Sequence, residues 1–525
     1  MAGLKGTRLR LTGQSLQLAQ IALIVAPAFI LFGYNQSGLG PLATLESWVH
    51  TFPEIDTVNT TGAQASHNST SKGAVIASFQ IGALIGAFSC MFIGDRLGRR
   101  KTVFVGSLLT MIGQVLQVAA FDLVQFVIGR ILLGAGVGQF SVAVPIWLSE
   151  CSEASRRGRH VILAGIFMCL GYALCNWLDF AFTFLPYSTL QWRIPLALSF
   201  APSLVISVFV FLIPESPRWL VRVNRTSEAL ASLAAYKGVP ETDEAVAAEI
   251  HGIQSSLETS DKKVSLVDIL LRKDDQDRLL YRFVLCLMLQ FFQQMCGGNL
   301  ISVYASTIFQ DNLGMSANLA KILAACALTW KFLCCFIAFF CIDRLGRRTV
   351  FIISGAGMSL CMAALAVTTS FSTSNKGASI ASATFIFLFN LFYPIGFLGG
   401  NFLYCTEVAP IHLRTAMNSV STANHWLWNF VVVMITPVAL DTIGYRYYII
   451  YAVISACIPV SVFFFYPETM NRNLELLNHV FRDAPTPWKI VSMARHLPQG
   501  EVTEAELFQR DHEKQDVAFE ERENI

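Results

Sequence analysis

The stretch Gly94-Asp95-Arg96-Leu97-Gly98-Arg99-Arg100 recurs in the second half of the chain as Ile342-Asp343-Arg344-Leu345-Gly346-Arg347-Arg348. Such a match indicates an internal duplication, because two copies of one short charged motif far apart in a chain are hard to obtain by chance. Two further pairs follow in the same order at similar separations: Glu150 with Arg157 and Glu407 with Arg414; Pro214-Glu215-Ser216 and Pro467-Glu468-Thr469.

Long apolar runs separate these motifs. The 525 residues are 54% hydrophobic and 14% charged, whereas soluble domains carry about 25% charged residues. The net charge of +2 gives no sign of a nucleic-acid partner. A membrane helix needs about 20 apolar residues, and twelve runs meet this need. The expected spans are 17–39, 73–94, 102–121, 124–147, 160–182, 194–213, 281–305, 317–342, 349–369, 380–405, 417–439 and 446–466.

The sequence therefore predicts an all-α membrane protein in which twelve transmembrane helices form two pseudo-symmetric six-helix halves. A polar stretch with a helical pattern separates the two halves. The expected organisation is an N-terminus at 1–16, an N-terminal half at 17–213, a linker at 214–280, a C-terminal half at 281–466 and a tail at 467–525.

The short loops predict the orientation. Basic residues gather in the loops that hold the repeated motifs, and cytoplasmic loops carry an excess of Lys and Arg. Both termini and the linker are thus expected in the cytoplasm, and loop 40–72 on the opposite side. That loop carries two acceptor patterns for N-glycosylation, at Asn59 and Asn68.

The cysteines and the polar residues give no sign of a cofactor. The thirteen Cys lie singly or as Cys334-Cys335 inside apolar runs, without the paired spacing of a zinc site. We expect no metal, no cofactor and no enzyme activity, because the chain has no set of residues typical of a catalytic site.

Several motifs together resemble the sugar porter family of the major facilitator superfamily. They are the repeated Asp-Arg-Leu-Gly-Arg-Arg, Pro214-Glu215-Ser216-Pro217-Arg218-Trp219-Leu220, Gln293-Gln294-Met295-Cys296-Gly297-Gly298-Asn299 and Pro467-Glu468-Thr469. Asn176-Trp177-Leu178-Asp179 is similar to fungal members. The resemblance implies the major facilitator fold and transport of a hexose or related polyol by alternating access. It also implies a monomer in the plasma membrane. A nutrient sensor is disfavoured, because such sensors carry much longer tails.

In transporters that this chain resembles, Arg and carboxylate residues at the cytoplasmic ends of the helices latch the halves together. The alternative is that they only anchor helix ends. Arg and carboxylate side chains form directional, charge-assisted hydrogen bonds. The corresponding residues are Asp95, Arg99, Glu150, Arg157, Glu215, Arg218, Asp343, Arg347, Glu407, Arg414 and Glu468.

Sugar recognition calls for neutral groups that donate and accept hydrogen bonds, with aromatic faces beside them. The start of the seventh span supplies Gln293, Gln294 and Asn299, and helical spacing places the last two near one another. The alternative is that these amides bridge helices. The full expected substrate site, partly carried over from the resemblance, is Gln293, Gln294, Asn299, Tyr304, Lys331, Phe402, His425 and Asn429.

The family pattern is only partly kept. Phe402 stands where relatives have a ring-stacking Trp, His425 replaces an Asn, and Gly165 replaces a Gln. These departures leave the identity of the sugar open.

Two replacements change the charge. Proton-coupled relatives carry an Asp at the position of Asn35, facing Arg130, and an amide takes up no proton. Uniport is therefore favoured over proton symport, with His425 as a possible replacement proton site. Lys331 lies inside a span and needs a partner, either an internal carboxylate or an anionic substrate. The alternative function is thus a proton-coupled symporter of an acidic sugar or a small organic acid such as galacturonate or quinate.

Overall fold

The computed structural model describes residues 11–43, 45–57, 59–152, 157–258, 278–371, 375–410, 413–470 and 474–496. Every regular element in these ranges is helical. Twelve segments are long and apolar enough to cross a membrane, and each overlaps one expected span. The prediction of an all-α protein with twelve membrane helices is confirmed, and the chain is an integral, multi-pass membrane protein.

The first six spans make up the N-terminal half. The π-helical turn η1 joins α1 and α2 in the first span, and α9, α10 and η3 follow one another in the sixth. The bounds are α1 (Gly13–Gln20), η1 (Ile21–Val25), α2 (Ala26–Ser37), α3 (Leu39–Leu42), α4 (Glu46–Thr51), η2 (Pro53–Ile55), α5 (Gly62–Leu97), α6 (Arg99–Val118), α7 (Leu123–Cys151), α8 (Arg157–Phe182), α9 (Leu190–Leu198), α10 (Phe200–Phe209) and η3 (Val210–Leu212).

The last six spans make up the C-terminal half, in which the seventh and tenth spans are each built from more than one helix. The bounds are α15 (Leu279–Met295), α16 (Gly298–Thr307), η4 (Ile308–Asn312), α17 (Ala317–Leu345), α18 (Arg347–Thr369), α19 (Lys376–Phe397), α20 (Gly400–Val408), α21 (Arg414–Ile443) and α22 (Arg446–Phe465).

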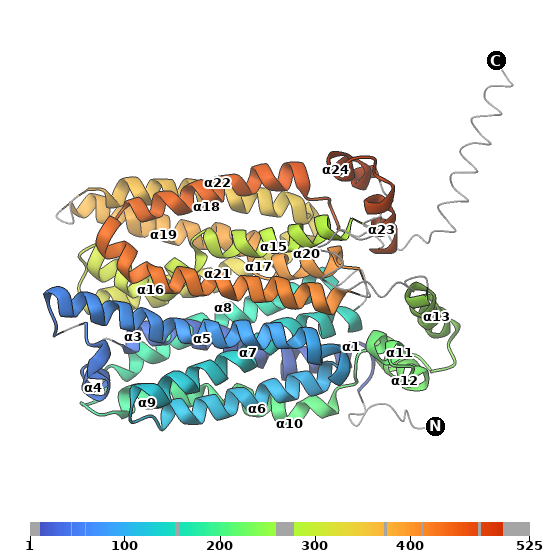
Figure 1. Cartoon of the computed structure of the whole chain (residues 1–525), viewed down its shortest axis with the longest axis horizontal. Helices are drawn as coiled ribbons and strands as arrows, with labels where there is room; N and C mark the ends of the chain where they lie inside the picture. Colours follow the sequence, from blue (N-terminus) through green and yellow to red (C-terminus); the bar gives the residue numbers. More distant parts are fainter. Residues whose placement is uncertain are drawn as a thin grey trace, which may run out of the picture.

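Five shorter helices lie at one end of the bundle (Figure 1). They are α11 (Pro217–Arg222), α12 (Thr226–Lys237), α13 (Glu244–Glu258), α23 (Leu474–Asp483) and α24 (Pro487–His496). The first three form a separate small core, in which Trp219, Leu233 and Ile250 are buried. Because the repeated charged motifs lie at this end, we call it the motif end, and the opposite end, where α4 lies, the far end.

The two halves meet along two helix pairs, α5 with α21 and α8 with α17. Within the N-terminal half, α5 and α7 approach closely through small residues. A Cβ atom on Gly86 would lie 1.9 Å from the carbonyl oxygen of Ala135, so only glycine fits there. Membrane helices commonly pack through such small residues. Large apolar side chains such as Phe92, Leu360 and Val453 are exposed on the outside of the bundle, where a lipid environment would cover them.

Two membrane helices of the C-terminal half are broken. The seventh span bends between α15 and α16 at Gly297, with φ of 91°, and the tenth bends between α19 and α20 at Gly399, with φ of 92°. Both breaks lie within expected spans, 281–305 and 380–405, which the structure confirms as membrane-spanning segments. Hydropathy did not indicate the breaks, because it does not register the left-handed conformation that glycine adopts readily. Broken helices free backbone groups where transporters bind substrates.

Candidate functional site

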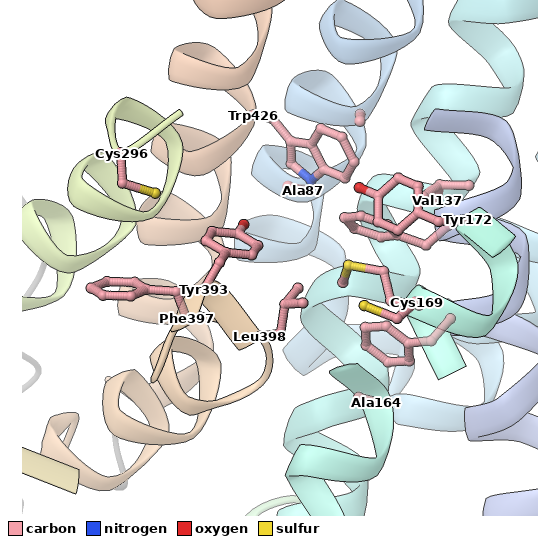
Figure 2. Packing of buried hydrophobic residues seen from close by; sticks show 14 of the residues in the cluster. Ala87, Val137, Ala164, Cys169, Tyr172, Cys296, Tyr393, Phe397, Leu398 and Trp426 are labelled. Atoms are coloured by element: carbon pink, nitrogen blue, oxygen red, sulfur yellow. The ribbon is translucent and has the colours of Figure 1, made fainter. Parts of the chain in front are cut away.

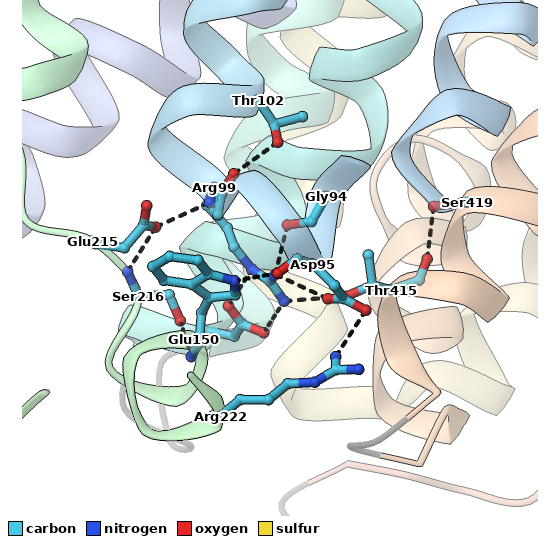
Figure 3. A network of polar contacts seen from close by, with 12 residues as sticks. Gly94, Asp95, Arg99, Thr102, Glu150, Glu215, Ser216, Arg222, Thr415 and Ser419 are labelled. Atoms are coloured by element: carbon cyan, nitrogen blue, oxygen red, sulfur yellow. Dashed lines mark hydrogen bonds and ion pairs between the residues drawn. The ribbon is translucent and has the colours of Figure 1, made fainter. Parts of the chain in front are cut away.

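Arg99 is the centre of a buried ion-pair network at the motif end (Figure 3). Its Nε and Nη2 atoms donate to the two oxygens of Glu150 at 3.0 and 2.9 Å. Its Nη1 atom lies 3.3 Å from Asp95 Oδ1. Arg222, from α11, pairs with the other oxygen of Asp95 at 2.8 Å. The guanidinium and Glu150 are nearly fully buried, so the two-oxygen geometry offsets the cost of removing both charges from water.

Glu215, at the start of the linker, belongs to the same network. Its carboxylate accepts the backbone N–H groups of Arg99 and Arg100, each at 3.1 Å, and that of Ser216 at 3.0 Å. Burial raises the pKa of the Glu215 carboxyl, while the backbone N–H groups of Ser216 and Arg100 act in the opposite direction. Gly98 makes this approach possible, since it has φ of 84° and a Cβ there would lie 2.7 Å from Glu215 Oε2.

The C-terminal half repeats this arrangement. Arg347 donates to Glu407 at 3.3 and 3.0 Å and to Asp343 at 2.9 Å. Glu468 accepts the backbone N–H groups of Arg347 and Arg348, both at 3.0 Å. Gly346 has φ of 85°, matching Gly98. The duplication seen in the sequence is therefore a duplication of geometry.

Side-chain interactions among the described residues cross between the halves at the motif end. Arg99 Nη2 donates to Thr415 Oγ1 of α21 at 3.1 Å, and Arg159 of α8 pairs with Asp343 of α17 at 3.3 Å. The networks thus do more than anchor helix ends, since they also hold the two halves together.

The structure changes the assignment of one expected member of the network and does not describe the side chain of another. Arg218 makes no ion pair with the described residues, and the assignment of Arg218 is corrected to Arg222, one turn further along α11. Sequence spacing missed this because the turn of the helix that faces Asp95 depends on how α11 docks. The side chain of Arg157 lies outside the described part of the chain.

The break between α15 and α16 brings three of the expected substrate-binding amides together. Asn299 Nδ2 donates to Gln294 Oε1, so the predicted proximity of these two residues is confirmed. Gln293 Nε2 donates to the carbonyl of Phe397, at the end of α19, at 3.0 Å. All three side chains are buried. The two broken helices therefore meet at the amides that the sequence singled out.

Further residues extend the amides into what we call the central polar cluster: Gln290, Gln293, Gln294, Asn299, Asn401, His425 and Asn429. His425 Nδ1 lies 2.9 Å from Gln294 Nε2 and 3.2 Å from Gln290 Oε1. Asn401 donates to Gln290 and Gln293 at 2.7 and 2.8 Å. Sequence reasoning missed Gln290 and Asn401, although Gln290 lies one helical turn before Gln294 and was open to detection by this spacing.

Asn429, also on α21, differs from the other amides of the cluster. Its Oδ1 and Nδ2 atoms are both buried without a hydrogen-bond partner in the described residues. The Tyr304 hydroxyl donates a hydrogen bond to the carbonyl of Val433 at 2.8 Å. The ring centroids of Phe402 and His425 lie 5.5 Å apart. Gln290 Nε2 and Asn401 Oδ1 also lack a partner in the described residues, but in Asn429 both polar atoms are free. Asn429 thus offers the largest free hydrogen-bonding capacity of the cluster, whereas Tyr304 is engaged by the backbone.

Lys331 of α17 is fully inside the bundle, where the halves face one another. Its Nζ atom donates to Ser302 Oγ at 2.7 Å and lies over the rings of Tyr172 and Tyr393, at 5.0 and 4.5 Å. Figure 2 shows these two tyrosines on facing helices of the two halves. No carboxylate pairs with Lys331 among the residues that the structure covers. In the described part of the chain, a hydroxyl and two ring faces stand where the expected alternative was an internal carboxylate.

Gly165, which replaces a family Gln, lies where α8 touches the break between α19 and α20. A Cβ there would lie 2.6 Å from the carbonyl oxygen of Leu398. A glutamine side chain would therefore force the two halves apart at this contact. The replacement is explained by close backbone approach between the halves.

Asn35 and Arg130 line one small cavity inside the N-terminal half, together with Asp179 of α8. Asn35 Nδ2 donates to its own helix at the carbonyl of Leu31, 3.0 Å away. Arg130 donates to the carbonyl of Ile76 at 3.0 Å, and its Nε atom has no partner among the described residues. Sequence reasoning missed Asp179 as a site residue. The available signal was an acidic residue inside an apolar span, which by itself marks a functional candidate.

The two glycosylation candidates have different surroundings. Asn59 is exposed in the loop before α5. Asn68 is only 1% exposed, donates its amide to the carbonyl of Asp56 at 2.7 Å and lies within α5. A buried, engaged amide inside a helix is a poor acceptor, so we keep only Asn59 as a candidate.

Comparisons with known proteins agree with this architecture. The family described as "Sugar (and other) transporter" matches residues 21–481. The sugar transporter STL1 of Saccharomyces cerevisiae is 32% identical over 508 residues, covering 94% of this chain and 87% of that protein. The MFS-type transporter oryC of Aspergillus oryzae is 35% identical over 415 residues, covering 78% and 77%. These relatives are transporters and not enzymes.

Solved structures show the same fold. The proton:xylose symporter XylE bound to 6-bromo-6-deoxy-D-glucose superposes with a TM-score of 0.76 at 23% identity, covering 88% of this chain and 98% of that chain. The inward-open conformation of XylE from E. coli gives a TM-score of 0.65 at 22% identity, covering 87% and 98%. The chain therefore has the major facilitator fold.

Proposed function

The chain belongs to the sugar (and other) transporter family of the major facilitator superfamily, and we propose that it carries a neutral hexose or a related polyol by alternating access. The observation that carries this proposal is the unpartnered amide of Asn429 beside the central polar cluster. A buried amide without partners costs about 1–3 kcal/mol. A sugar hydroxyl both donates and accepts, so it would pair with both atoms of Asn429.

The chemistry of the cluster supports a neutral substrate. Amides and an imidazole form it, and its described residues include no carboxylate and no guanidinium. Aromatic rings adjoin it, with Phe32 and Trp426 centred 4.8 Å apart and Phe402 against His425. Rings of this kind suit the apolar face of a pyranose.

One observation favours a second candidate. Lys331 is buried near the cluster and donates to Ser302, and no carboxylate of the described ranges pairs with it. An ammonium group in such a place is stabilised by an anionic ligand. The competing proposal is therefore transport of an acidic sugar or a small organic acid such as galacturonate or quinate.

Alternating access is supported by the interactions that cross the halves at the motif end. The Arg99–Thr415 hydrogen bond and the Arg159–Asp343 ion pair join side chains of opposite halves. They must break when the halves separate at that end. The networks within each half involve no relative movement and can persist, so the crossing pairs act as the latch.

The mode of energy coupling depends on the cavity near Arg130. Uniport is favoured by Asn35, because its amide takes up no proton. Asp179 lines the same cavity and supplies a carboxyl group from another helix, which favours a proton-coupled mode. Uniport is therefore the proposal that competes with a proton-coupled mode.

The orientation of the chain in the membrane, its oligomeric state and its location are proposals drawn from the sequence. We place both termini and the linker, residues 214–280, in the cytoplasm, because the motif end holds the basic loops. The six-helix halves run over 17–213 and 281–466, with the tail after 467. We further propose a monomer in the plasma membrane, with a glycan at Asn59. A reporter in the linker found on the same side as loop 40–72 would contradict this orientation.

The test of the substrate is exchange in proteoliposomes that contain the purified full chain. Labelled D-glucose, D-sorbitol, D-galacturonate and quinate are each supplied at equal concentration on both sides, so that no driving force is needed. We expect exchange of D-glucose or D-sorbitol, with weak competition by the two anions. Exchange of the anions alone would establish the competing proposal, and exchange of none of the four would overturn both.

A further inference from the structure

Asp179 is a carboxyl group buried inside a membrane-spanning helix. It is 0% exposed and lies near the far end of α8. Its Oδ2 atom has a weak contact from Cys175 Sγ at 3.6 Å. Its Oδ1 atom is buried without a hydrogen-bond partner in the described residues. A charged carboxylate in such a place is costly unless it is paired or protonated.

The groups around Asp179 are engaged elsewhere. Tyr34 donates its hydroxyl to the carbonyl of Pro195 at 2.7 Å, and Asn35 donates to Leu31. Asn176, on the same helix as Asp179, donates to Ser37 Oγ and to the carbonyl of Tyr172. None of these three side chains therefore supplies a proton to the free oxygen of Asp179.

Two cations belong to helices that surround this carboxyl. Arg130 of α7 lines the same cavity, which has room for about one water molecule, and its Nε atom is also without a partner among the described residues. Lys321 belongs to α17 of the opposite half, the helix that packs against α8. The other titratable groups in contact with this region are Tyr34 and Cys175.

We propose that Asp179 binds the transported proton in a proton:sugar symport, doing from α8 what residue 35 of α2 does not do here. The inference rests on the proposed transport function. It follows from the position of Asp179, whose buried Oδ1 atom has no partner among the described residues, which shares a cavity with Arg130 and which lies on the helix that packs against α17 of the opposite half. The carboxylate takes one proton from the medium on one side and returns it on the other, and a neutral substrate moves with it.

The two cations explain how the proton changes the balance between conformations. Arg130 moves together with Asp179, because α7 and α8 belong to one half. Lys321 lies across the contact between α8 and α17, which also includes a hydrogen bond from Trp177 to Thr329 at 2.9 Å. Ionised Asp179 thus favours the state in which these helices are together, and protonation removes that preference. A proton shifts an equilibrium only through such a difference between states.

The test uses the full chain in proteoliposomes, with whichever of labelled D-glucose and D-sorbitol exchanges. Exchange without a gradient reports transport itself, and accumulation driven by an inside-alkaline pH difference of one unit reports coupling. We expect wild-type accumulation of at most about tenfold for one proton per substrate. Asp179→Asn should retain exchange while its accumulation ratio falls to one. Asp179→Glu should restore part of the accumulation.

Glu54→Gln is the matched control, because Glu54 is an exposed carboxylate before α5 and its loss should leave accumulation unchanged. Lys321→Gln provides a second variant that keeps the carboxyl, and it should shift the pH at which accumulation is half-maximal. Exchange with no accumulation by the wild type would overturn the inference in favour of uniport. Unchanged accumulation in Asp179→Asn would also overturn it. Failure of the wild type to exchange either probe would instead overturn the proposed function, and this inference with it.

Discussion

At the motif end the two halves have the same chemistry, whereas their interiors differ. Arg99 and Arg347 each pair with an acid four residues earlier and with a buried glutamate of another helix. Inside the bundle, the N-terminal half holds a guanidinium and a carboxyl group around a small cavity, those of Arg130 and Asp179. The C-terminal half holds the central polar cluster on its broken helices and on α21.

This difference indicates that the two halves took on different functions after the duplication. Both copies keep the buried arginine–carboxylate network at the ends of their helices. The interiors of the two halves can differ, because binding a substrate requires only one set of amides and binding a proton requires only one carboxyl group. We therefore expect substitutions at the motif end to affect both halves alike, and substitutions inside to have separable effects.

The largest expected effect is the loss of a central arginine. Arg99→Ala leaves Asp95 and Glu150 without their main partner, and removing one member of a buried pair costs about 3–5 kcal/mol. Arg347→Ala should cost a similar amount, because its partners and burial match. The measurement is the thermal unfolding midpoint of the purified protein in detergent.

Arg225→Ala is the control for both, since Arg225 forms an exposed pair with Glu228 that is worth less than about 1 kcal/mol. If only one of Arg99→Ala and Arg347→Ala lowered the unfolding midpoint more than this control does, the two halves would not be equivalent at the motif end.

A smaller effect is expected inside the C-terminal half. Asn429→Ala should weaken substrate binding by about 1–3 kcal/mol, because the substrate loses its hydrogen bonds to this amide. Protein stability should be unchanged or slightly higher, since the unpartnered polar atoms are removed. Exchange measured over a range of substrate concentrations gives the affinity.

The matched control is Asn424→Ala, on the same helix. Both polar atoms of that amide are paired within the C-terminal half, to the carbonyl of Leu287 and the indole N–H of Trp428. We expect it to lower stability and leave affinity nearly unaltered. The reverse pattern would assign Asn429 to helix packing.

Lys331→Asn separates the two substrate classes. For a neutral substrate we expect an affinity within about threefold of wild type, because the ammonium group is engaged by Ser302 and two ring faces. For an anionic substrate the loss should be tenfold or more, roughly the value of one charge-assisted hydrogen bond. Competition of D-galacturonate against D-glucose in exchange measures this.

The smallest effect is expected for Arg222, whose ion pair with Asp95 comes from the linker. Its side chain is partly exposed, so Arg222→Ala should cost at most about 1 kcal/mol. A loss close to that of Arg99→Ala would show that the linker helix contributes to the latch of one half, and it would sharpen the comparison by revealing an asymmetry at the motif end.

The sequence by itself determined the fold. Each of the twelve spans is recognisable because a membrane requires a continuous apolar run with internally bonded backbone, and this property is local along the chain. The repeated motifs, which include Gly98 and Gly346, likewise predicted the duplication and the residues that pair with Arg99. Gln294 and Asn299 could be predicted as neighbours because only five residues separate them.

Only the tertiary structure decided which distant side chains meet. Three features depend on how helices are rotated and shifted against one another: the pairing of Arg222 in place of Arg218, the joining of Gln290 and Asn401 to the cluster, and the placing of Asp179 and Arg130 around one cavity. The helix breaks at Gly297 and Gly399 set part of that register. The physical reason is that hydropathy fixes which segments enter the membrane, while close packing of their side chains fixes which faces touch.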